Sequence, residues 1–101
     1  MKFTNSCKKM KLPNEKVVDI LSNVFEKINI WIQDTDEKAE AGGYIVGYQH
    51  SGTENITLED ISQPCMLDKR TRIYFGMRDP RHQFFLKKSI RKKSFYMGVW
   101  H

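Results

Sequence analysis

The apolar positions of the chain follow a helical period in one long segment near the N-terminus. From residue 14 to 33, Val, Leu, Ile and aromatic residues recur at three- and four-residue steps, which places them on one face of a helix. Asn14 precedes the pattern as a helix N-cap, and Glu15 lies in the first turn, where the helix dipole favours an acid. The spacing therefore predicts a helix over 14–33 whose apolar face belongs to the core.

Shorter apolar segments predict β-strands. A continuous apolar run is typical of a central strand, and alternation is typical of a half-buried one. Turn residues at Ser51-Gly52 connect two of these segments as a hairpin. The predicted strands are Lys9–Leu12, Gly42–Tyr48, Ile56–Ile61, Arg72–Phe75 and Phe95–Trp100.

A second helix is predicted to begin at Asp79-Pro80, because an acid at the N-cap followed by proline is a strong helix start. Its basic residues lie opposite an apolar side formed by Phe84, Phe85, Leu86 and Ile90. The predicted order is strand, helix, three strands, helix, strand. We therefore expect an α/β domain of the α+β type, with a mixed β-sheet packed against two helices.

Length and composition favour one cytoplasmic domain spanning residues 1–101. The N-terminal residues lack the apolar core of a targeting signal, and no stretch approaches the roughly 20 apolar residues of a membrane span. Cys7 and Cys65 match no zinc or redox spacing, so both are expected to be reduced thiols.

Charge is segregated along the chain. Residues 34–60 carry seven acids and one base, whereas residues 69–101 carry ten bases and one acid. A basic C-terminal half fits nucleic acid, an acidic protein partner, or charge balance within the fold. The charge pattern alone does not choose among these.

Two residues stand where catalytic chemistry could occur. Glu40 immediately precedes the strand opened by Gly42-Gly43, so its carboxylate could be held over a cleft as a general base; the alternative is an ordinary surface glutamate. His101 ends an apolar strand, and such a rigid element fixes the direction of an imidazole ligand. Its alternative is a solvated terminal histidine.

Taken together, these segments resemble the JAB/MPN (JAMM) metalloprotease family. Residues 40–47, Glu-Ala-Gly-Gly-Tyr-Ile-Val-Gly, are similar to the Glu-x-Gly-Gly-x-x-x-Gly opening of that family. Residues 96–101, Tyr-Met-Gly-Val-Trp-His, resemble the strand that enters its Trp-His-x-His-Pro zinc motif. The helix start at residues 79–83 is similar to the bacterial branch, which contains deconjugating peptidases found beside anti-phage operons. The resemblance covers the chain from the first helix onward.

The resemblance implies a JAB/MPN-like, cytidine-deaminase-like fold and a zinc-dependent isopeptidase acting on a ubiquitin-like conjugate or a conjugated enzyme. In the family, two histidines and an aspartate hold Zn²⁺, a glutamate is the general base and a serine stabilises the oxyanion. Glu40 matches the base and His101 the first zinc ligand. The second histidine, the serine and the aspartate have no counterpart, so we expect a C-terminally incomplete domain with weak zinc binding and negligible activity alone.

Other interpretations remain. One is a non-catalytic, protein-binding scaffold of the same fold; a coding sequence that continues past His101 with the remaining zinc ligands would favour the enzyme instead. Another is a small basic nucleic-acid-binding domain, which we expect less because the helix aromatics share its apolar side. An uncovered apolar strand at 95–100 would favour a homodimer through the sheet edge. His50 and His82 are expected to have no metal role.

Overall fold

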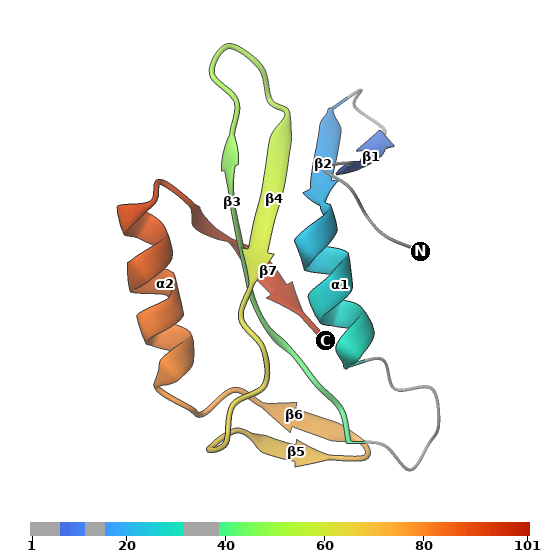
Figure 1. Ribbon diagram of the computed structural model, residues 1–101, viewed down its shortest axis with the longest axis vertical. Helices are drawn as coiled ribbons and strands as arrows, with labels where there is room; N and C mark the ends of the chain where they lie inside the picture. Colours follow the sequence, from blue (N-terminus) through green and yellow to red (C-terminus); the bar gives the residue numbers. More distant parts are fainter. Residues whose placement is uncertain (1–6, 12–15, 32–38) are drawn as a thin grey trace.

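The computed structural model describes residues 7–11, 16–31 and 39–101 (Figure 1). The predicted N-cap at Asn14 and the acidic turn before residue 39 lie largely outside these ranges. None of the helices within them is long and apolar enough to cross a membrane. The elements are β1 (Cys7–Lys11), β2 (Val17–Leu21), α1 (Ser22–Ile30), β3 (Gly43–Gln49), β4 (Ile56–Ile61), β5 (Lys69–Thr71), β6 (Tyr74–Gly76), α2 (Arg81–Arg91) and β7 (Phe95–Trp100).

Five strands form one mixed sheet in the order β1-β2-β4-β3-β7. The β2–β4 pair is parallel, and the other three neighbouring pairs are antiparallel. Helix α1 packs against β2 and β4, and α2 packs against β3 and β7, so the two helices flank the central β3–β4 pair (Figure 1). The expectation of a mixed sheet packed against two helices is confirmed.

The prediction of one helix over 14–33 is wrong in its first part. Residues 17–21 form β2, and the helix begins only at Ser22. The run Val-Val-Asp-Ile-Leu fits both a helical face and a strand. Its β-branched residues favour a strand, and β2 pairs with β1 on one side and β4 on the other. Two ladders of backbone hydrogen bonds therefore outweigh the local helical spacing.

The core lies between the central strands and the helices. Val46 and Ile61 are each 1% exposed, and Val24 of α1 is 2% exposed. Polar contacts fix α1 against β4, because Lys27 forms an ion pair with Asp60 and the Asn23 amide donates to the Glu59 carbonyl oxygen at 2.7 Å. The fold therefore rests on a small apolar core with polar contacts at its margin.

The single strand predicted at Arg72–Phe75 is replaced by a hairpin. Strands β5 and β6 pair with each other in a separate two-stranded sheet, and Arg72-Ile73 forms the turn between them. Neither of these residues is a common turn former, so the local sequence carries no signal for this turn. The hairpin lies beside the N-terminal approach to β3 (Figure 1).

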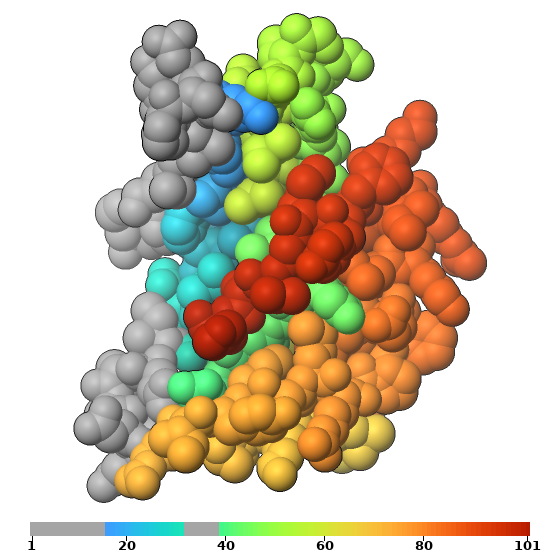
Figure 2. Space-filling view, turned by 180° about the vertical axis from the view of Figure 1, so that it is seen from behind, coloured from blue at the N-terminus to red at the C-terminus, as the bar shows by residue number. Residues whose placement is uncertain are grey.

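Strand β7 matches the predicted range, and its apolar residues are exposed as expected for an uncovered strand. It lies at one end of the strand order and pairs only with β3 in the described sheet. Phe95, Tyr96 and Val99 are each about half exposed, so none of these three side chains belongs to the core. β7 runs diagonally across the surface in Figure 2. This is the edge at which the sequence predicts self-association.

Helix α2 begins at Arg81 with Pro80 at the N-cap position, one residue later than the sequence predicts. The Asp79 carboxylate accepts the Arg81 N–H at 2.9 Å, so the acid still satisfies a donor of the first turn, as an N-cap side chain would. The predicted apolar side is only partly buried, however, because Phe84 is 63% exposed and Ile90 is 54% exposed. The packed side instead centres on His82 and Ser89.

Candidate functional site

The two glycines before β3 allow the ends of distant segments to meet. A Cβ on Gly42 would lie 2.6 Å from the Trp100 carbonyl oxygen and 2.9 Å from His101 Cβ, and one on Gly43 would overlap the backbone of Ser62. Neither site has room for a side chain. These close approaches bring the residues before β3 against the end of β7 and against Ser62.

Glu40 and His101 line the same cavity, although they lie far apart in the sequence. The cavity has a volume of about 320 Å³ and lies between the β5–β6 hairpin and the C-terminal end of β7. These two elements border each other on the face shown in Figure 2. The remaining lining is mostly apolar and consists of Ile73, Tyr74, Phe75, Met77, Val99 and Trp100. A carboxylate and an imidazole thus share an apolar groove.

The backbone of Glu40 is held by the hairpin. Its N–H donates to the Thr71 carbonyl oxygen at 2.8 Å, and its carbonyl oxygen accepts from Arg70 Nε at 2.8 Å. The Arg70 guanidinium also lies 4.8 Å from the centre of the Trp31 ring. Within the described part of the chain, no hydrogen bond or ion pair occupies the Glu40 carboxylate. The hairpin therefore fixes the backbone of Glu40 beside the cavity, while its carboxylate has no partner among the described residues.

The described residues that line this cavity do not complete a catalytic zinc site. Such a site needs three protein ligands, and the chain has only three histidines. His50 follows the opposite end of β3, roughly 20 Å away at about 3.3 Å per residue, where its Nε2 pairs with Thr57 Oγ1 at 2.8 Å. His82 is engaged in a separate buried network. His101 is thus the single imidazole available to the cavity.

That buried network joins Ser62, His82 and Asp68, and the sequence did not predict it. His82 Nδ1 lies 2.7 Å from Ser62 Oγ, and His82 Nε2 lies 2.5 Å from Asp68 Oδ2. Ser62 Oγ also accepts the Tyr44 N–H at 2.8 Å, which leaves the serine proton for Nδ1. The histidine tautomer with its proton on Nε2 fits both contacts, because Nε2 then donates to Asp68 and Nδ1 accepts from Ser62. His82 is therefore held on both ring nitrogens by hydrogen bonds inside the fold.

This serine–histidine–aspartate arrangement does not resemble a working nucleophile. Ser62 is 5% exposed and His82 is 1% exposed, so a substrate carbonyl has no route to the hydroxyl. The Ser62 oxygen is also fixed against the β3 backbone through Tyr44. The network therefore joins the end of β4, the following loop and the first turn of α2.

Asp68 and Asp79 are the carboxylates that tie this loop to α2. Burial alone would raise the pKa of Asp68, but hydrogen bonds from the Asp79 N–H, the His82 ring and the N–H groups of Cys65 and Arg78 hold that pKa below its ordinary value of 3.8. The N–H groups of Arg81 and Leu67 likewise lower the pKa of Asp79. Both carboxylates are thus stabilised in their charged form.

The lowered pKa values predict acid sensitivity. A carboxylate whose pKa is lower in the folded state stabilises the fold fully at a pH above its pKa in the unfolded chain, which is near 3.8. This stabilisation is lost as the pH falls through the pKa of the folded state. Urea unfolding at pH 6 and pH 3 should therefore show Asp79→Asn less stable than the wild type at pH 6, with the difference narrowing at pH 3. Glu26→Gln, on the exposed side of α1, should follow the wild type. An Asp79→Asn deficit equal at both pH values would contradict this.

Cys65 lies next to the same network. Its Sγ, a carboxylate oxygen of Asp68 and a ring nitrogen of His82 all lie within 4.8 Å of one another, and within the described ranges this is the one such group of three potential metal ligands. Burial, followed by the nearby charges of Asp79 and Asp68, raises the pKa of the Cys65 thiol above 9.0. The spacing Cys65-x-x-Asp68 was the available sequence signal, but His82 joins it only through the fold.

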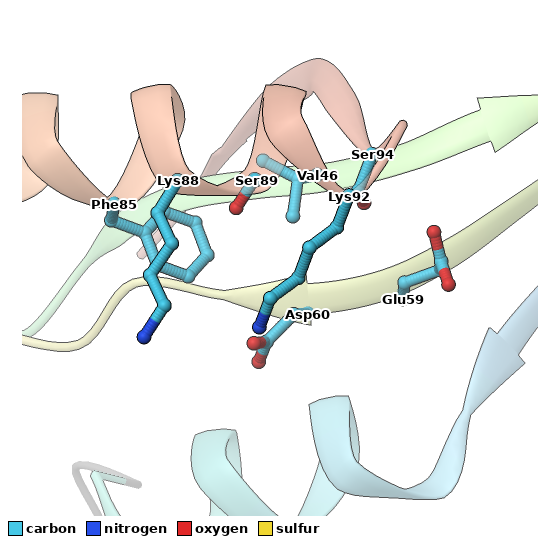
Figure 3. A pocket seen from close by; sticks show the side chains of 8 residues that line it. All are labelled: Val46, Glu59, Asp60, Phe85, Lys88, Ser89, Lys92 and Ser94. Carbon is cyan, nitrogen blue, oxygen red and sulfur yellow. The ribbon is translucent and has the colours of Figure 1, made fainter.

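A second cavity of about 260 Å³ lies between α2 and β4. Figure 3 shows Lys88 of α2 and Lys92, just after its last residue, reaching toward β4, where Glu59 and Asp60 lie. Ser94 Oγ also lines this side and is buried without a partner among the described residues. The cavity contains charges of both signs, and Asp60 is already paired with Lys27, so it selects neither an anion nor a cation.

Comparison with known proteins adds no family assignment. No family model matches the chain, and no curated protein matches it significantly.

Proposed function

We propose that this chain is a JAB/MPN-type isopeptidase domain that acts in the cytoplasm on a ubiquitin-like conjugate or a conjugated enzyme. The observation that carries the proposal is that Glu40 and His101 line one cavity. These are the two residues that match the family's general base and first zinc ligand. A general base and a zinc ligand of one enzyme must lie at the same site, as Glu40 and His101 do. A chance resemblance in two separate segments would give no reason for the two residues to lie together.

The cavity also suits the substrate. An isopeptidase must hold the extended tail that precedes the scissile bond, and an apolar groove ending at a carboxylate and an imidazole provides a binding surface and a reactive end. Strand β7 borders the groove and has one free edge in the described sheet, which could pair with an extended peptide. We expect the tail to lie along β7 with its C-terminus toward His101.

A zinc ion bound at this cavity would act as a Lewis acid and activate a water molecule. In this chain, His101 would contribute one imidazole to the metal, and Glu40 would accept and return the proton. The other ligands that zinc needs are not provided by the described residues at this cavity. We therefore derive no hydrolytic step for the 101-residue chain and expect it to bind the tail without cleaving it.

Binding at the cavity is tested with a labelled peptide that reproduces the C-terminal tail of a ubiquitin-like protein. Ile73→Asp should weaken binding at least about tenfold, since a charge replaces apolar surface in the groove. Ile73 is 83% exposed, so the change should leave the fold intact. Fluorescence anisotropy gives both affinities.

Met66→Asp is the matched control for Ile73→Asp. Met66 is 82% exposed and does not line the cavity, so its variant should bind the peptide within about twofold of the wild type. Equal loss in the two variants would indicate a nonspecific charge effect. Unchanged binding by Ile73→Asp would remove the cavity as the tail site.

Hydrolysis is expected to be absent from the 101-residue protein. With one imidazole at the cavity and no second one within reach, added Zn²⁺ should produce no measurable cleavage of an isopeptide-linked conjugate. Gel analysis of the conjugate over hours measures this. Efficient cleavage that disappears in Glu40→Gln would show that the cavity holds zinc with more ligands than His101, while supporting the role of Glu40.

A non-catalytic scaffold is the second candidate. It is favoured by the observation that the group of three potential ligands in the described residues lies outside the Glu40–His101 cavity. A scaffold would bind its partner with no dependence on Glu40. Two results together would favour the scaffold. Glu40→Gln and the wild type would bind the tail equally with and without Zn²⁺, and a variant extended by the family's remaining zinc ligands would still not cleave the conjugate.

A nucleic-acid-binding function is the third candidate, and α2 is the surface for it. Phe84 is 63% exposed and the Lys87 ammonium lies 6.0 Å from the centre of its ring, which corrects the expectation that the helix aromatics are turned inward. Affinity for an oligonucleotide would then fall steeply with salt. Undetectable binding at low salt would exclude this candidate.

A further inference from the structure

The Cys65, Asp68 and His82 side chains form a compact set of three different ligand types. A thiol sulfur, a carboxylate oxygen and an imidazole nitrogen lie within 4.8 Å of one another. Zn²⁺ binds sulfur, nitrogen and oxygen ligands of this kind at about 2.0–2.3 Å in a tetrahedral arrangement. None of the three lines the Glu40–His101 cavity, so the cluster is a separate site.

The environment of His82 fits a metal-bound imidazole. A ligating histidine usually directs its other ring nitrogen to a hydrogen-bond partner, which fixes the orientation of the ring. His82 Nδ1 lies 2.7 Å from Ser62 Oγ, while Nε2 points to Asp68. The ring is 1% exposed, so its orientation is already set by packing.

Only a small movement would convert the hydrogen-bonded cluster into a metal site. Nε2 and Oδ2 are 2.5 Å apart, whereas two nitrogen or oxygen ligands of a tetrahedral zinc lie roughly 3.4 Å apart. An opening of about 1 Å, by rotation of the Asp68 and Cys65 side chains, would admit the ion. Cys65 is half-buried, which gives the ion a route from solvent.

We propose that Cys65, Asp68 and His82 bind one Zn²⁺ through Sγ, a carboxylate oxygen and Nε2, with water as the fourth ligand. The ion would replace the proton that joins Nε2 to Asp68. The imidazole proton would then reside on Nδ1 and donate to Ser62 Oγ, and the Cys65 thiol would release its proton to solvent. The metal would clamp the loop after β4 to the start of α2, independently of the proposed isopeptidase cavity.

The test uses Co²⁺ as a spectroscopic substitute for Zn²⁺ in the 101-residue protein after treatment with a chelator. One equivalent of Co²⁺ should produce a thiolate-to-metal charge-transfer band and the d–d bands of a tetrahedral ion, and Zn²⁺ should displace both. Cys65→Ser should lose the charge-transfer band. Cys7→Ser, which alters the other cysteine, and His101→Ala, which alters the cavity, should keep it.

Melting temperature and affinity provide a second, independent measurement. Zn²⁺ should raise the melting temperature of the wild type and of His101→Ala but not that of Cys65→Ser. Ser62→Ala should weaken Zn²⁺ binding by about 10- to 100-fold, the usual effect of removing the partner of a ligating histidine. Circular dichroism establishes that each variant is folded before metal is added.

Three outcomes would overturn the proposal. These are the absence of a charge-transfer band in the wild type at one equivalent, its persistence in Cys65→Ser, or its loss in Cys7→Ser. Loss of metal binding in His101→Ala with retention in Cys65→Ser would assign the ion to the Glu40–His101 cavity instead. The metal cluster and the proposed function can therefore fail separately.

Discussion

Replacing Asp68 with asparagine should lower the free energy of unfolding by about 2–4 kcal/mol, as expected when buried donors lose their acceptor. The Asp68 carboxylate accepts four hydrogen bonds: from His82 Nε2 and from the N–H groups of Cys65, Arg78 and Asp79. Asparagine has one oxygen and one NH₂ group. In either orientation of the asparagine amide, its NH₂ group faces donors that the Asp68 carboxylate oxygen accepted in the wild type.

Urea unfolding of Asp68→Asn at pH 7 with a chelator present, followed by tryptophan fluorescence and circular dichroism, measures this loss. The chelator removes any contribution from metal. Glu26→Gln is the control, because this exposed α1 residue should change stability by less than about 0.5 kcal/mol. The loss is a large part of the total, since small domains are stable by only about 5–15 kcal/mol. A loss of less than about 1 kcal/mol would mean that the network contributes little to the fold.

Replacing Gly47 with alanine should be at least as damaging, with a loss of about 3 kcal/mol. Gly47 lies at the irregularity in the β3–β4 register. A Cβ there would overlap the Thr57 carbonyl oxygen and lie 2.9 Å from the Thr57 carbonyl carbon and 3.0 Å from Leu58 Cα. All three atoms belong to the backbone of the central strand pair, so no side-chain rotation can relieve the contact.

Gly52→Ala is the matched control for Gly47→Ala. Gly52 has a φ of +78°, and a Cβ at this position would have no atom within 4 Å, so alanine there meets only backbone strain of about 1 kcal/mol. The same urea experiment compares the two variants. A smaller loss for Gly47→Ala than for Gly52→Ala would contradict the close approach of β3 and β4.

The sequence predicted most accurately the elements for which all local signals favoured the same structure. The range of Ile56–Ile61 and that of Phe95–Trp100 are confirmed, and α2 begins one residue later than predicted. Each combines an apolar run or a capping residue with a clear break at its end. The first helix failed because residues 17–21 suit two periods, and the choice between them depends on strands that pair only in the folded chain.

The buried network was beyond the reach of the sequence for a different reason. Ser62, Asp68 and His82 lie on three segments, and nothing in their spacing predicts that the fold will bring them to hydrogen-bonding distance. The Gly42-Gly43 pair was different, because a pair of glycines at a strand entrance predicts close backbone approach. That is why the sequence could suggest the Glu40 cavity but not the Cys65–Asp68–His82 cluster.

The groove beside Glu40 and His101 is the proposed site for an extended peptide tail. The most direct measurement is a titration of the ¹⁵N-labelled protein with the tail peptide, followed by amide chemical shifts. We expect saturable shifts at Glu40, Phe75 and Trp100, none at Lys88 of α2 or at Lys92 just after it, and loss of the shifts in Ile73→Asp. Unshifted amides around the groove at saturating peptide, or shifts confined to α2, would contradict it.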